Sequence, residues 1–182
     1  MTRRDPEYAG DPAHTPKEVE RKFLINPKQV PADLRDRVER ELALKQGYIA
    51  VAADGSELRI RSTNAEGFEL TVKSSGDMVR GESNIEITPE MFAALWPKTE
   101  GARVEKTRLQ IPYGPQTIEV DIYDGELEGL VVAEVEFHGN EELGVSPERH
   151  AEDFVPPDWF DKEVTFDKAY KNKNLATRGL PS

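Results

Sequence analysis

The sequence predicts a mostly β protein of the α+β class, built on a meandering antiparallel sheet. Short segments that alternate apolar and charged residues recur along the chain, which is the period-two pattern of strands. Turn-forming pairs such as Asp54-Gly55 and Asp124-Gly125 separate these segments. Only two segments carry helical spacing. The regular succession of short strands leaves open whether the sheet closes into a barrel.

The chain has 182 residues, a length that fits one domain with one sizeable core. Residues 1–16 are polar, contain three prolines and lack the apolar stretch of a signal peptide. We therefore expect a disordered leader over residues 1–16 and a single domain over residues 17–178.

The first strand of the domain is expected immediately after the leader. Val19, Phe23 and Ile25 alternate or nearly alternate with charged residues, and Pro27 follows. Proline cannot donate a hydrogen bond to a strand ladder, so the strand ends before it.

Two helices are expected to accompany the sheet. Leu34, Val38 and Leu42 recur at helical spacing within Pro31 to Leu44, which predicts an amphipathic helix there. A second helix is expected from Pro89 to Trp96, because another proline comes directly after it.

Seven further strand-like segments bring the expected number of strands to eight. Successive side chains of a strand point to opposite faces, and in most of these segments the charged residues share one face. Open wet faces of antiparallel sheets usually carry neutral polar residues as well, whereas here paired charges dominate. The segments are Gly47 to Ala52, Glu57 to Ser62, Gly67 to Ser74, Val79 to Thr88, Val104 to Ile111, Thr117 to Tyr123 and Val131 to His138.

The side of the sheet that carries the charged residues is exposed either to solvent or to the interior of a barrel. An interior with many ions costs several kcal/mol per unpaired ion unless water, partner charges or a ligand compensate. Carboxylates without His or Cys partners are hard oxygen donors that suit Mg²⁺ or Mn²⁺, while Arg and Lys bind phosphate. The pattern therefore predicts a polyanionic phosphate substrate held by cations and bridged by metal to carboxylates, as phosphoryl transfer requires.

The overall composition narrows the class of partner. Charged residues make up 32% of the chain and the formal net charge is -11, so a nucleic-acid backbone and an anionic membrane would both be repelled. The absence of cysteine excludes disulfides, thiolate metal sites and cysteine nucleophiles, and fits a cytoplasmic location. No P-loop motif is present. A small polyphosphate is the expected partner, and the chain is expected to be a monomer or a homodimer.

A family resemblance supports this interpretation. Glu18-Val19-Glu20-Arg21-Lys22 resembles the ExExK signature of the CYTH superfamily, the triphosphate tunnel metalloenzymes. The resemblance extends from there to the C-terminus, and the ordered series of motifs is more specific than ExExK alone. The further motifs are Gln46-Gly47-Tyr48, Arg59-x-Arg61, Thr71-Val72-Lys73, Arg80-x-Glu82, Glu105-Lys106-Thr107-Arg108, Glu119-Val120-Asp121, Glu134-Val135-Glu136, Glu163-Val164-Thr165 and Tyr170-Lys171-Asn172.

The resemblance implies an eight-stranded antiparallel closed β-barrel, the triphosphate tunnel, with a charged interior and helices packed on the outside. It implies metal ligands at Glu18, Glu20, Glu119, Asp121, Glu134 and Glu136. It implies phosphate contacts from Lys22, Arg59, Arg61, Lys73, Arg80, Lys106, Arg108 and Lys168. Among these residues, Lys22, Lys106, Arg108 and Glu136 would have catalytic roles.

One position departs from the family pattern. Many members have R-x-E-x-E, and here Asn84 replaces the second acid, with Glu86 two residues further on. The chain looks most like the compact bacterial inorganic tripolyphosphatases, which implies hydrolysis of tripolyphosphate to pyrophosphate and phosphate with Mg²⁺ or Mn²⁺. The alternatives are an organic triphosphatase, a class IV-type adenylate cyclase, or a module that binds polyphosphate without cleaving it.

Overall fold

The computed structural model describes residues 19–73, 82–139 and 144–181. The expected leader, Glu18 and Arg80 lie outside these ranges. The strands are β1 (Val19–Ile25), β2 (Arg40–Val51), β3 (Glu57–Thr63), β4 (Gly67–Lys73), β5 (Glu82–Glu86), β6 (Arg103–Tyr113), β7 (Gln116–Tyr123), β8 (Val131–Phe137) and β9 (Phe160–Glu163). The helices are α1 (Pro89–Leu95), α2 (Pro147–Asp153) and α3 (Asn172–Arg178), and the 3-10 turns are η2 (Leu34–Arg37), η3 (Trp96–Thr99), η4 (Gly125–Leu127) and η5 (Lys168–Tyr170).

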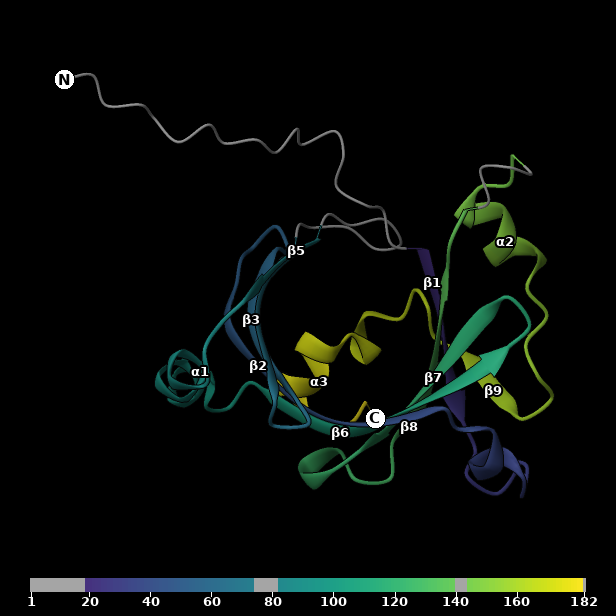
Figure 1. The fold of residues 1–182 in the computed structure, drawn as a ribbon, viewed down its shortest axis with the longest axis horizontal. Coiled ribbons are helices and arrows are strands. Elements are labelled where there is room, and N and C mark those ends of the chain that lie inside the picture. Colours follow the sequence, from purple (N-terminus) through teal and green to yellow (C-terminus); the bar gives the residue numbers. More distant parts are fainter. Residues whose placement is uncertain (1–18, 74–81, 140–143, 182) are drawn as a thin grey trace.

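The strands form one antiparallel sheet, in the order β5-β4-β3-β2-β6-β7-β8-β1-β9. Figure 1 shows the sheet curled most of the way round on itself. The expected closed barrel of eight strands is wrong, because the sheet has nine strands and, within the described ranges, no ladder joins its edge strands β5 and β9. The additional strand, β9, has only four residues, which is too short for alternation to reveal it.

The helix expected over Pro31 to Leu44 is also wrong. Only the η2 turn is helical there, and β2 begins at Arg40. Leu42 and Leu44 fit an alternating pattern as well as a helical one, so periodicity alone is ambiguous in this segment. Pairing decides the outcome, because β2 forms ladders with both β3 and β6.

The larger apolar core lies on the outer face of β6, β7, β8 and β1. Phe23, Val135 and Phe137 of this face pack against the segment that runs from α2 to β9. Phe154 lies with its ring centroid 5.3 Å from that of Phe137, and the ring of Phe160 lies 4.9 Å from that of Phe23. This packing leaves the other face of the same strands free for charged side chains.

The predicted helix at Pro89 to Trp96 is confirmed by α1, which packs on the outer side of β3 and β4. The expectation that all helices lie outside is wrong for α3, which Figure 1 shows within the curve of the sheet. Leu175 of α3 is buried in a second cluster with Tyr48 and Tyr123. None of the helices in the described ranges is long and apolar enough to cross a membrane.

Candidate active site

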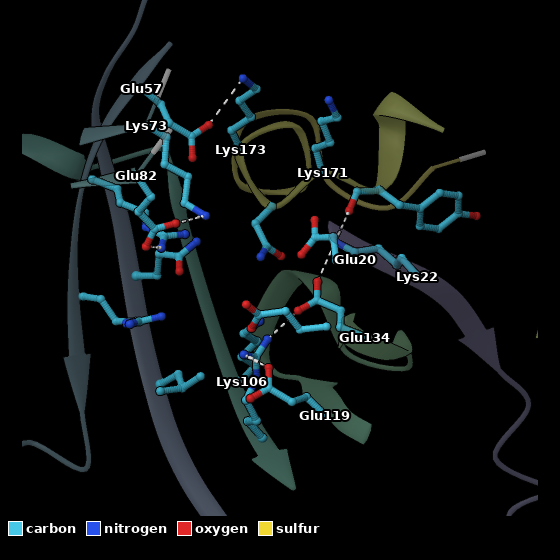
Figure 2. A pocket seen from close by; sticks show the side chains of 18 of the residues that line it. Glu20, Lys22, Glu57, Lys73, Glu82, Lys106, Glu119, Glu134, Lys171 and Lys173 are labelled. Atoms are coloured by element: carbon cyan, nitrogen blue, oxygen red, sulfur yellow. Dashed lines mark hydrogen bonds and ion pairs between the residues drawn. The ribbon is translucent and has the colours of Figure 1, made fainter. Parts of the chain in front are cut away.

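A cavity of about 350 Å³ lies on the concave face of the sheet, between the strands and the C-terminal segment. Figure 2 shows its side chains converging from strands on two sides and from the segment that leads into α3. Among the described residues, eight cations and seven carboxylates line it. The cations are Lys22, Arg59, Arg61, Lys73, Lys106, Arg108, Lys171 and Lys173, and the carboxylates are Glu20, Glu57, Glu82, Glu119, Glu134, Glu136 and Asp167.

One wall of the cavity is built by β7, β8 and β1, whose register brings carboxylates side by side. Glu119 lies opposite Glu134, and Glu134 lies opposite Lys22. Two residues along these strands, Glu136 lies opposite Glu20. Like charges that face each other directly destabilise a sheet, so this wall requires cations from the protein or from a ligand.

Arg108 of β6 brings positive charge to that wall, where its guanidinium pairs with three carboxylates. Its Nε and Nη2 donate to Asp121 Oδ1 and Oδ2 at 2.6 and 2.7 Å. Its Nη2 also donates to Glu134 Oε2 at 2.6 Å, and its Nη1 pairs with Glu119. One guanidinium therefore bridges the like-charged pair Glu119 and Glu134.

Asp121 lies beneath the cavity and is not part of its lining. Its side chain is fully buried and pairs with Lys106 as well as with Arg108. Because protein cations occupy both of its oxygens, Asp121 acts as the counter-ion that fixes Lys106 and Arg108 in place. Its predicted role as a metal ligand stays a prediction.

Lys22 extends from β1 to the centre of the carboxylate wall. Its Nζ lies 2.6 Å from Glu134 Oε1 and donates to the carbonyl oxygen of Tyr170 at 3.4 Å. Its backbone N–H donates to Thr165 Oγ1 at 3.0 Å. These contacts connect the wall to the C-terminal segment.

The lysines of the cavity differ in how firmly they hold their protons. Burial works against the charge of Lys22, but Glu134 and Glu20 outweigh it and raise the pKa of Lys22. Burial and the neighbouring charge of Arg108 lower the pKa of Lys106. For Glu134, burial favours the neutral form, yet Lys22, Arg108 and Lys106 together hold its pKa well below the usual range. Lys22 and Glu134 are therefore both charged at neutral pH.

The opposite wall is built by β3, β4 and β5. Lys73 lies opposite Glu57 on one side and opposite Glu82 on the other, and it forms an ion pair with Glu82. Arg59 Nη2 reaches Glu82 Oε1 only at 3.5 Å, and Arg59 Nε is buried with no hydrogen-bond partner among the described residues. A buried donor without a partner indicates a place for an acceptor from a ligand.

Arg61 lies further along the same wall. Its Nη2 and Nε donate to Glu69 Oε2 at 2.6 and 3.1 Å, and both residues face each other in the β3–β4 register. Arg61 therefore lines the cavity while its charge is already paired with that of Glu69.

The C-terminal segment forms the third side of the cavity. Lys173 Nζ donates to the carbonyl oxygen of Gly55 at 2.6 Å and lies 3.3 Å from Glu57 Oε2. Asn172 Oδ1 accepts a hydrogen bond from the Tyr123 hydroxyl at 2.6 Å. Lys168, the expected phosphate ligand of this segment, is exposed and lies outside the lining. The lysines of this C-terminal segment that line the cavity are Lys171 and Lys173.

Sequence reasoning missed several lining residues. Glu57 stands two residues before Arg59, so strand alternation could have placed it on the same face. Lys171 falls in the Tyr170-Lys171-Asn172 motif, but no strand alternation could place Lys171 or Lys173 in the cavity, because their position depends on the packing of Leu175 against the concave face.

The donor atoms of the site suit a hard divalent cation, but their arrangement does not form a complete set of ligands. Its donors are carboxylate oxygens, which match Mg²⁺ or Mn²⁺. Within the described ranges, no three acidic or histidine side chains are gathered closely enough to hold an ion by themselves. Mg²⁺ in proteins usually takes one or two carboxylates and completes its shell with water and substrate phosphates. Glu20 and Glu136, which face each other across β1 and β8, fit that requirement.

Comparison with known proteins decides the family. Residues 16–156 match the model of the CYTH domain. The chain belongs to the CYTH domain family. This CYTH protein is 44% identical to an inorganic triphosphatase of Nitrosomonas europaea over 161 residues, which cover 87% of this chain and 96% of the relative. It is 36% identical to an inorganic triphosphatase of Acetivibrio thermocellus, with coverage of 87% and 92%.

Solved structures share the fold of this CYTH protein. The crystal structure of an inorganic triphosphatase superposes with a TM-score of 0.64 at 38% identity, and the match covers 93% of this chain and 99% of that chain. The predicted resemblance to the CYTH superfamily is therefore confirmed, together with the mostly β fold.

Proposed function

We propose that this CYTH protein is an inorganic triphosphatase that hydrolyses tripolyphosphate to pyrophosphate and phosphate. The observation that carries the proposal is the pairing of two charged walls across one cavity, with cations on β3 and β4 facing carboxylates on β7, β8 and β1. The names of the two bacterial relatives, which match nearly their full lengths, support the same activity.

The cationic side chains would hold the substrate. Arg59 and Lys73 take phosphate oxygens on one wall, and the unpartnered Arg59 Nε supplies a donor for one of them. Lys22, Lys106 and Arg108 would hold phosphate from the other side, and Arg61 would extend the cationic surface. Arg80, which lies outside the described residues, stays a predicted phosphate contact. A polyphosphate chain offers many oxygens of high charge density, which suits cations that are fixed in place by their own counter-ions.

Hydrolysis would proceed by in-line attack of water on a terminal phosphorus. Glu136 would orient the water and accept its proton, and the bond from phosphorus to the bridging oxygen would break. Pyrophosphate would leave with the electron pair of that bond. Lys106 and Arg108 would stabilise the charge that builds on the bridging oxygen and the transferring phosphoryl group.

Glu20 and Glu136 are the residues best placed to hold a divalent cation, with Glu18, Glu119 and Glu134 as further candidates. A bound Mg²⁺ or Mn²⁺ would supply neutralisation of the phosphate charges. We further propose that the protein is cytoplasmic, which the absence of cysteine supports. We also propose that it is a monomer or a homodimer.

The proposal is tested by measuring phosphate release from tripolyphosphate, pyrophosphate, ATP and thiamine triphosphate, each with Mg²⁺, Mn²⁺ or a chelator. We expect strong release from tripolyphosphate with metal and none with chelator. Preference for ATP or thiamine triphosphate would overturn the inorganic substrate. Binding of tripolyphosphate without release under any metal would overturn catalysis and leave a binding module.

The Glu20→Gln variant tests the carboxylate wall in the same assay. We expect metal-dependent turnover to be lost while the melting temperature stays close to that of the parent protein. Full activity in this variant would contradict the assignment of Glu20 to the metal.

A further inference from the structure

The side chain of Asn84 is held by two hydrogen bonds. Asn84 Nδ2 donates to Glu82 Oε1 at 2.9 Å. Asn84 Oδ1 accepts from Thr71 Oγ1 at 2.7 Å. Thr71 is fully buried on β4 and lies directly opposite Asn84 in the β4–β5 register.

The chemistry of the neighbours fixes which way the amide points. An ionised carboxylate can only accept hydrogen bonds, so Glu82 requires the NH₂ group of Asn84. The amide oxygen is then left for the Thr71 hydroxyl, which donates to it. An ionised aspartate at this position has no donor for Glu82 and would place two like charges together.

Glu82 is the counter-ion of Lys73 and Arg59 on this wall. It pairs with Lys73 and lies 3.5 Å from Arg59. Burial favours its neutral form, but Lys73, Asn84 and Arg59 outweigh burial and lower the pKa of Glu82. The carboxylate therefore stays ionised at neutral pH, and its placement sets how much charge Lys73 and Arg59 retain for a phosphate.

We propose that Asn84 is a positioning residue, which holds Glu82 against Lys73 by a neutral donor and so keeps Arg59 available to polyphosphate. This inference rests on the proposed function, because it concerns how the same cavity binds its substrate. The neutral amide adds no negative charge to the wall, whereas an acid would neutralise one of the two cations. Binding of a highly charged phosphate chain is the property that such a change affects most.

The test compares Asn84→Asp with Asn84→Ala and with the matched control Ser83→Asp. Ser83 is the neighbour of Asn84 on β5, is exposed, and points to the opposite face of the strand. We expect Asn84→Asp to raise KM for tripolyphosphate about tenfold, as the loss of a hydrogen bond to a charged group would. We expect kcat to change by less than about threefold and Ser83→Asp to behave like the parent protein.

A pH series separates positioning from a structural role. In Asn84→Asp, repulsion between the introduced carboxylate and Glu82 raises the pKa of the pair, so one proton binds as the pH falls. Once protonated, the introduced carboxyl group donates to Glu82 as the amide does, so the KM ratio of variant to parent should fall toward one between pH 8 and pH 5. The ratio for Asn84→Ala should not change with pH. The charged groups that face this position from the surrounding described strands are Glu82, Glu86, Glu69, Lys73, Glu57, Arg59 and Arg61.

Calorimetric titration of tripolyphosphate in the presence of chelator distinguishes the failure of this inference from the failure of the proposed function. If the parent protein binds tripolyphosphate but does not cleave it, the dissociation constants of the three variants test Asn84 in the same way. Equal effects of Asn84→Asp and Ser83→Asp, or a KM ratio that ignores pH, would overturn the inference. A parent protein that neither binds nor cleaves tripolyphosphate would overturn both.

Discussion

Lys22 and Glu134 face each other across β1 and β8, with Nζ and Oε1 2.6 Å apart and both side chains largely buried. Glu134 also accepts a hydrogen bond from Arg108. One carboxylate therefore contacts two buried cations, and it links three strands on the concave face.

Removal of that carboxylate should be costly. Glu134→Gln removes the carboxylate that pairs with the buried Lys22, whereas Arg108 keeps Asp121 and Glu119, and we expect the free energy of unfolding to fall by about 3 kcal/mol. Urea denaturation measures this change. The matched control is Glu136→Gln, which removes the same charge two residues along β8 from an exposed side chain. Glu136→Gln should keep the stability of the parent protein and lose activity, and equal destabilisation by both variants would contradict this prediction.

Arg108→Lys keeps the charge of the side chain and removes its forked geometry. Arg108 contacts Asp121 through two nitrogens and also reaches Glu119 and Glu134. A lysine cannot make these contacts together, so we expect kcat for tripolyphosphate to fall on the order of 100-fold. Steady-state kinetics measure this loss. Arg61 forms an ion pair with one carboxylate, that of Glu69, so Arg61→Lys should cost much less in kcat.

Gly47 is required by a close contact between β2 and the η3 turn. A Cβ atom at residue 47 would lie 2.4 Å from Thr99 Oγ1 and 2.6 Å from Thr99 Cβ, and Thr99 is fully buried. We expect Gly47→Ala to lower the free energy of unfolding by about 2–3 kcal/mol. Gly67→Ala is the control, because its nearest new contact is an ordinary 3.8 Å to Thr63. Thermal unfolding should give a clearly lower melting temperature for Gly47→Ala than for Gly67→Ala. Similar melting temperatures of the two variants would refute the clash at residue 47.

Arg21 and Glu163 predict a pH-dependent contribution to stability. Arg21 Nε and Nη2 donate to the two carboxylate oxygens of Glu163 at 2.9 and 2.7 Å, and these hydrogen bonds lower the pKa of Glu163 below its usual 4.5. A lowered folded-state pKa stabilises the fold above pH 4.5, and this stabilisation is lost as the pH falls through the folded value. Glu163→Gln should be less stable than the parent by under about 1 kcal/mol at pH 7.

The difference between parent and Glu163→Gln should shrink as the pH is lowered below 4.5. Urea denaturation at several pH values measures it. A difference that stays constant or grows in acid would show that the Arg21 contact does not depend on the charge of Glu163.

Much of the concave face could be predicted from the sequence. Alternation placed Arg59 and Arg61 on one face of a strand, and Glu134 and Glu136 on one face of another, and the structure brings all four to the cavity. The reason is that strand periodicity fixes the face of each side chain once the strand itself is recognised.

Features that depend on tertiary contacts could not be predicted in this way. The start of β2 at Arg40 follows from its pairing with β3 and β6, while the local spacing fitted a helix. The choice of Lys173 over Lys168 as a lining residue follows from how α3 docks on the sheet. The docking leaves no periodic signal in its own segment, and the signal at the start of β2 fits a helix as well as a strand.

The near balance of cations and carboxylates around the cavity has a kinetic consequence. The lining charges almost cancel, while the whole chain carries a formal net charge of -11. An approaching polyanion is therefore repelled at long range and attracted only within a Debye length of the fixed cations, about 10 Å at 0.1 M salt. Association of tripolyphosphate should become faster as moderate salt is added, the reverse of the salt dependence that marks electrostatically steered enzymes.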